Sequence, residues 1–150
     1  MRFLPFSLAF LASSSMLGLP QNAPKPGIEV GLNRETALYL RVTLTSGAAT
    51  TVRFYRSDLP WGNRYSMVFA AVRPNGEPVD LTFPIDDPGP TEVSVKPGEM
   101  LTGDIDLHYV IADLNAMKKS DILLFWGYKS PDALQIPCWS GGLVLIPRQK

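Results

Sequence analysis

The segment ALYLRVTLT, at residues 37–45, alternates between apolar and more polar side chains with a period of two. Successive side chains of a β-strand point to opposite faces, so this period predicts a strand with one buried face. It is the most regular alternation in the chain, and it predicts that this segment belongs to a sheet with one face on a core. The side expected to be buried consists of Leu38, Leu40, Val42 and Leu44.

Shorter runs of the same kind recur along the chain at intervals of about ten residues, separated by Pro and Gly turns such as Pro74-Asn75-Gly76. This spacing predicts an all-β fold, an antiparallel sandwich of about eight strands, with a closed barrel as the alternative. The most apolar segment, 121–129, is expected to be central, with either of its two faces on the core. The other expected strands are 28–33, 51–56, 65–72, 78–83, 91–96, 100–107 and 143–147.

The period changes between residues 107 and 120. Val110, Leu114 and Met117 recur at helical spacing, and two lysines follow, which suit a helix C-terminus. One short crossover helix is therefore expected at one end of the sheets.

The first residues, MRFLPFSLAFLASSSMLGLP, have the layout of an export signal. Arg2 supplies the positive start, 3–12 the apolar stretch, and small residues from Ala12 a cleavage site, with Ala23 as a second candidate. We expect a signal peptide and linker start over 1–23 and one β-sandwich domain over 24–150. The protein is then exported, to the periplasm or beyond, without a stable membrane span after cleavage.

Charge and cysteine content narrow the class of protein. The 14 Lys and Arg residues balance the 14 Asp and Glu residues, which argues against nucleic acid as a partner because nucleic-acid binding requires a basic surface. Cys138 is the only cysteine, so no internal disulfide forms, and its apolar neighbours predict that the thiol is buried.

The residues that catalysis and metal binding need are scarce. His108 is the only histidine, and its neighbours predict a local hydrogen bond or an exposed position rather than a catalytic base. One histidine and one cysteine are too few for zinc, and the acidic loops lack the spacing of a known calcium motif. Asp104 and Asp106 are expected to face solvent instead of forming a glycosidase pair. We therefore expect no enzyme and no cofactor.

The segment SDLPWGNRYSMVF, at 57–69, places Trp61 between a proline and a glycine. An indole in such a loop is either an exposed anchor for a partner or a plug over the end of the core, and its burial gain favours the plug. The loops that we would test first for partner binding contain Trp61, Asn63 and Arg64 in one case and Asp86 and Asp87 in the other.

Residues 93–128 combine a VSVKPGE turn, the strand end GDIDL, a helical crossover and an aromatic-rich strand. This layout resembles bacterial immunoglobulin-like modules of the proteinase-inhibitor type. The resemblance implies an immunoglobulin-like sandwich and makes protease binding or inhibition a candidate function. It implies no particular site residue.

These features together predict an exported, non-enzymatic β-sandwich module that binds another macromolecule or supports an envelope assembly, with a protein or a glycan as the partner. A secreted proteinase inhibitor is one alternative. A carbohydrate-binding module, with Trp61 as part of a stacking platform, is the other.

Overall fold

The computed structural model describes residues 24–33, 35, 38–63, 66–82, 89–113 and 115–149. Within them the chain forms eight strands, and every strand pair is antiparallel. The strands are β1 (Gly27–Leu32), β2 (Tyr39–Thr45), β3 (Val52–Tyr55), β4 (Met67–Val72), β5 (Glu92–Val95), β6 (Met100–Asp106), β7 (Ile122–Lys129) and β8 (Trp139–Ile146).

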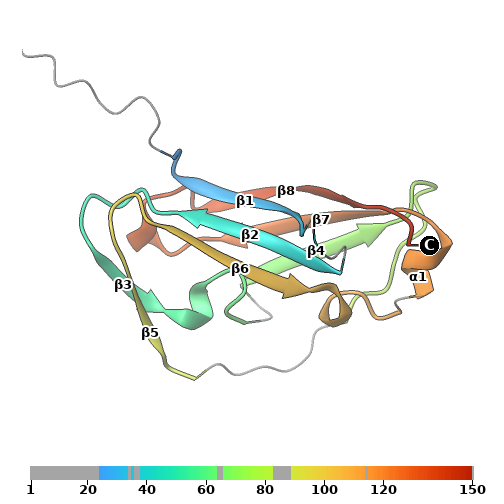
Figure 1. Ribbon diagram of the computed structural model, residues 1–150, viewed down its shortest axis with the longest axis horizontal. Helices are drawn as coiled ribbons and strands as arrows, with labels where there is room; N and C mark the ends of the chain where they lie inside the picture. Colours follow the sequence, from blue (N-terminus) through green and yellow to red (C-terminus); the bar gives the residue numbers. More distant parts are fainter. Residues whose placement is uncertain are drawn as a thin grey trace, which may run out of the picture.

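The strands form two three-stranded sheets, β1–β2–β6 and β4–β7–β8, and a small β3–β5 sheet. Figure 1 shows the β1–β2–β6 sheet lying across the β4–β7–β8 sheet, with β3 and β5 at the end opposite the helix. Buried side chains from both large sheets meet between them, including Leu40 and Val42 from β2 and Leu124 and Tyr128 from β7. The expected all-β sandwich is confirmed.

Strand β2 carries the alternation on which the fold prediction rests. Leu40 and Val42 are each 0% exposed and Leu44 is 1% exposed, while Arg41 lies on the outside. Strand β2 lies between β1 and β6, and its Val42 pairs with Val30 on one side and Gly103 on the other. One buried face and one outer face on this sheet follow directly from the period of two.

The crossover between β6 and β7 is helical, as expected, but the helix is short. Leu107–Tyr109 forms a 3-10 turn (η2), and α1 covers only Asn115–Lys119. Val110 and Met117 are buried, as their spacing predicts, whereas Leu114 lies outside the described residues. No helix in the described part of the chain is long and apolar enough to span a membrane.

Two sequence predictions near turns are wrong. Residues 78–83 form no strand within their described part, because their backbone hydrogen bonds go to two different segments. The Val79 N–H donates to the carbonyl of Ala71, whereas the Thr82 N–H donates to the carbonyl of Val110. Pro78 has no N–H and so cannot extend a ladder. The last strand was expected over 143–147, but it begins four residues earlier, at Trp139.

Strand β7 is central in its sheet, as its apolar sequence predicts, and pairs with β4 and β8. Its inner face is now defined: Ile122, Leu124 and Tyr128 are all 0% exposed. Phe125, which lies on the opposite face, is 44% exposed. The predicted signal peptide at 1–23 lies outside the described residues.

Candidate binding surface

Trp61 follows a 3-10 turn, η1 (Arg56–Asp58), and packs partly buried against the core. Its indole lies over Gly103 of β6, and a Cβ atom added at Gly103 would collide with the ring. Gly62, the next residue, is equally constrained, because a Cβ there would strike the carbonyl of Arg56. These contacts support the interpretation of Trp61 as a plug over the core.

Asn63 lies beside Trp61 and holds the same loop closed. Its side-chain amide donates to the carbonyl of Ser57 at 3.0 Å, and its backbone N–H donates to the Ser66 hydroxyl at 3.3 Å. The Ser66 hydroxyl itself donates to Ser57 at 2.6 Å. Of the five predicted partner-binding residues, Trp61 and Asn63 are brought together here. The other three, Arg64, Asp86 and Asp87, lie outside the described residues.

Below this loop, the phenol of Tyr128 donates a hydrogen bond to the carbonyl of Asp58 at 2.8 Å. The side chain is 0% exposed, and burial raises the pKa of the Tyr128 phenol above its ordinary value, with a smaller contribution from the nearby Asp58 carboxylate. This bond ties η1 to the central strand of the β4–β7–β8 sheet. The loop is therefore fixed from both sides, by Tyr128 and by the stacking of Trp61.

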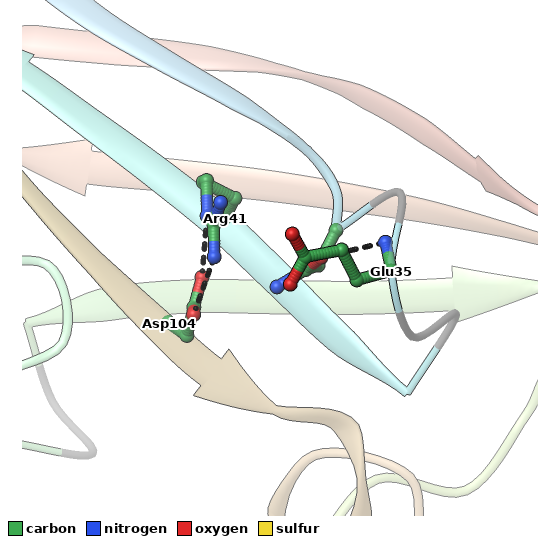
Figure 2. Close-up of polar contacts among 4 residues, drawn as sticks. Glu35, Arg41 and Asp104 are labelled. Atoms are coloured by element: carbon green, nitrogen blue, oxygen red, sulfur yellow. Dashed lines mark hydrogen bonds and ion pairs between the residues drawn. The ribbon is translucent and has the colours of Figure 1, made fainter.

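The outer face of the β1–β2–β6 sheet is polar. Arg41 on β2 donates from Nε and Nη2 to the two carboxylate oxygens of Asp104 on β6, each at 3.0 Å. Figure 2 shows this pair bridging the two strands, with Glu35 close by. The hydrogen bonds from Arg41 lower the pKa of the Asp104 carboxyl, and the same bonds raise the pKa of the Arg41 guanidinium.

A shallow hollow of about 570 Å³ lies beside the Arg41–Asp104 pair, over Gly31. Glu29 and Glu35 also line it. The Arg41 guanidinium is already bound by Asp104, and two more carboxylates line the hollow, so the hollow does not favour an anionic ligand. This outer face is a solvated surface with an internal ion pair.

The outer face of the β4–β7–β8 sheet has the opposite character. Its side chains are almost all apolar, and five of them are highly exposed: Val68 at 59%, Phe125 at 44%, Trp139 at 62%, and Leu143 and Leu145 at 52% each. The only charged residue in the three strands is Lys129, at one end of β7. We call this surface the apolar face and define it as Val68, Ala70, Val72, Leu123, Phe125, Trp139, Leu143 and Leu145.

Two neighbouring rows of residues on the apolar face differ in side-chain size. The register places Ala70, Phe125 and Leu143 side by side across the three strands, and Val68, Gly127 and Gly141 in a neighbouring row. A Cβ at Gly127 would meet nothing closer than 3.9 Å, so the surface above this glycine is open. A bulky aromatic and aliphatic row therefore stands next to a row lowered by two glycines.

A second hollow, of about 440 Å³, opens where the first residues of β1 and β8 meet. Trp126 and Trp139 line it together with Lys25, Glu29 and Ser140. Trp126 is held in place because its indole lies over Gly142, where an added Cβ would be only 2.9 Å from the ring. The hollow thus combines one fixed and one exposed indole with nearby polar groups.

The structure defines the surroundings of His108 and Cys138. The backbone N–H and the ring Nδ1 of His108 both contact the Asp106 carboxylate, at 2.9 and 2.6 Å. The expected local hydrogen bond is confirmed. The described part of the chain has no group of three or more His, Cys, Asp or Glu side chains that could hold a metal ion. Cys138 is exposed, so the prediction of a buried thiol is wrong.

No protein-family model matches the chain, and a search of curated proteins gives no match. The apolar face was not among the sequence-predicted sites. Its signal was present in the segments MVFAAV, ILLFWGYK and GGLVLI, which are apolar at consecutive positions rather than alternate ones. Strands that are covered on both faces have this composition.

Proposed function

We propose that this chain is an exported, non-enzymatic β-sandwich module that acts by binding a protein surface to its apolar face. The observation that carries the proposal is the outer side of the β4–β7–β8 sheet, where Val68, Phe125, Leu143 and Leu145 are half exposed with no charged side chain between them. The leader-like sequence over 1–23 supports export.

The energetic reason is the cost of leaving such a surface in water. Contiguous exposed apolar patches larger than a few hundred Å² are uncommon on monomeric proteins and mark sites of association. Burial contributes roughly 25 cal/mol per Å² of apolar surface removed from water, so covering this face is a substantial driving force. Trp139 adds the kind of large, rigid side chain that dominates binding energy in interfaces.

Glycan binding is a second candidate, and the hollow between β1 and β8 favours it. Carbohydrate rings stack on exposed indoles, and here Trp139 stands beside Glu29 and Ser140, which can hydrogen-bond hydroxyl groups. Trp61, the residue first considered for this role, packs on Gly103 instead. Proteinase inhibition has support only from the resemblance of residues 93–128.

The proposal is tested by capture with three tagged proteins: wild type, Leu143→Glu and Thr43→Glu. Leu143 lies on the apolar face, while Thr43 is the matched control on the outer face of the β1–β2–β6 sheet. Each is incubated with the exported fraction of the native cells. We expect wild type and Thr43→Glu to retain the same protein, and Leu143→Glu to lose it. Equal retention by all three, or retention of nothing, contradicts the proposal.

The non-enzymatic part of the proposal has its own test. Wild type and His108→Ala are assayed with ester, peptide and glycoside substrates. We expect no turnover from either protein. Hydrolysis by wild type that disappears in His108→Ala would contradict the proposal, because His108 is the one histidine of the chain.

A further inference from the structure

We infer that the occupant of the apolar face is a second copy of this chain, so that two molecules pack their β4–β7–β8 sheets face to face about a two-fold axis. This inference rests on the proposed function, since it names the protein surface that the face binds. Three properties of the face support it: its area, its relief and its charge.

The five most exposed side chains of the face supply more than half of the area that a dimer needs on each partner. The five most exposed side chains of the face, two aromatic and three aliphatic, are 44–62% exposed. With roughly 150–250 Å² for a whole aromatic side chain and less for an aliphatic one, they present about 500 Å² of apolar surface together. A stable interface buries about 800 Å² on each partner. Ala70, Val72, Leu123 and the glycine row supply further surface between and beside these five.

The relief of the face is complementary to itself. Phe125 and Leu143 form the ridge, and Gly127 and Gly141 form the lowered row next to it. A two-fold axis between these rows places the ridge of each copy over the glycine row of the other. Side chains of two packed sheets interdigitate in this way across a gap of about 10 Å, and a two-fold interface uses the same patch on both copies.

The charge of the face favours a neutral, apolar partner. Lys129 is the single charged residue in the three strands and lies at the end of β7, opposite Trp139. Nucleic acid or an anionic membrane would be recognised by a group of basic residues, which the face does not have. The formal net charge of the chain is zero, so two copies do not repel each other as a whole.

The test is sedimentation equilibrium of the exported chain over a wide range of concentrations, with wild type, Leu143→Glu and Thr43→Glu. We expect wild type and Thr43→Glu to show the mass of a dimer that dissociates on dilution. Leu143→Glu should be a monomer, with a Kd raised roughly 30-fold or more, the change expected from losing a hot-spot contact. Phe125→Asn serves as a second face variant, and circular dichroism establishes that both face variants are folded.

Wild-type protein that stays monomeric at every concentration overturns the inference, as does a dimer that Leu143→Glu leaves intact. These failures are distinguishable from failure of the proposed function. If capture retains an unrelated protein on wild type but not on Leu143→Glu, the face binds a protein that is not a second copy. Co-sedimentation with neutral phosphatidylcholine vesicles is the last measurement. Binding of monomers to these vesicles through the apolar face would mean that the face binds lipid and not a second copy.

Discussion

The two large sheets have similar inner faces and opposite outer faces. The β1–β2–β6 sheet turns Arg41, Thr43 and Asp104 outward, and the β4–β7–β8 sheet turns Phe125 and Leu143 outward. The outer face of the first sheet is therefore polar enough to remain in contact with water. The second has the composition of a sheet that is covered on both sides, although the single chain covers only one. The difference indicates that the second sheet, and not the first, faces a partner.

The largest expected effect is the difference in unfolding free energy between a substitution on the inner face of this second sheet and one on its outer face. Leu124→Ala removes a side chain that is 0% exposed and should lower the free energy of unfolding by about 2–5 kcal/mol, because it leaves a cavity. Leu143→Ala, on the neighbouring strand, removes a side chain that is 52% exposed and should cost far less in dilute solution. Urea unfolding measures both. Equal losses would mean that Leu143 is part of the core and not of a binding surface.

The next effect compares an inward glycine with an outward one. Gly103→Ala forces a methyl group into the Trp61 ring, and overpacking of this kind costs about 1–3 kcal/mol. Gly127→Ala adds a methyl group over a surface that is open in the single chain, so in dilute solution, where a dimer is dissociated, its midpoint of thermal unfolding should stay close to that of wild type. A stable Gly103→Ala protein would show that Trp61 is not fixed against the core and would reopen its role as an exposed anchor.

A smaller effect concerns the buried phenol that joins η1 to β7. Tyr128→Phe removes the hydrogen bond to Asp58 and should lower the free energy of unfolding by about 1 kcal/mol at neutral pH. The raised pKa of Tyr128 in the folded state stabilises the protein below the ordinary value of 10.0, and this stabilisation is lost as the pH rises above that value. Wild type should therefore lose stability above pH 10.0 more steeply than Tyr128→Phe. Parallel pH profiles of the two proteins would contradict this account.

The smallest effect is expected on the polar outer face. The pKa of Asp104 is lowered in the folded state, so its ion pair with Arg41 stabilises the fold above the ordinary value of 3.8, and this contribution is lost as the pH falls through the folded-state pKa. Asp104→Asn should flatten this acid dependence slightly, and added salt should reduce the difference, because both side chains are largely exposed. Thermal unfolding between pH 5 and about pH 2 measures it. A large loss of stability at neutral pH would show that the polar face is more than a solvated surface.

Much of the fold was predictable because its strands have short-range signals. The alternation in β2 predicts its buried face, and turns such as Pro74-Asn75-Gly76 mark strand ends. The segment 78–83 was predicted wrongly for a reason that composition does not reveal: Val79 bonds back to the nearby Ala71, whereas Thr82 bonds to Val110, which is distant in sequence. The strand propensity of the segment does not predict that its hydrogen-bond partners lie in two different segments.

The candidate site was harder to predict than the fold. The residues predicted to bind a partner were expected in loops. The apolar face arises instead from the register of three strands, which places Phe125 beside Ala70 and Leu143. Trp139 lies outside the expected last strand, 143–147, yet it begins β8. The consecutive apolar residues of β4 and β7 were the one available signal. They indicate burial on both faces without saying what provides it.

The central claim is that the apolar face is covered in solution, and carbene footprinting of the wild-type chain tests it most directly. This labelling reaches any exposed side chain and needs no substitution. At high protein concentration we predict that Phe125, Leu143 and Leu145 are labelled far less than Met100, which is 54% exposed on the β1–β2–β6 sheet, and that dilution restores their labelling. Labelling of all four in proportion to their exposure in the single chain, at every concentration, would contradict the claim.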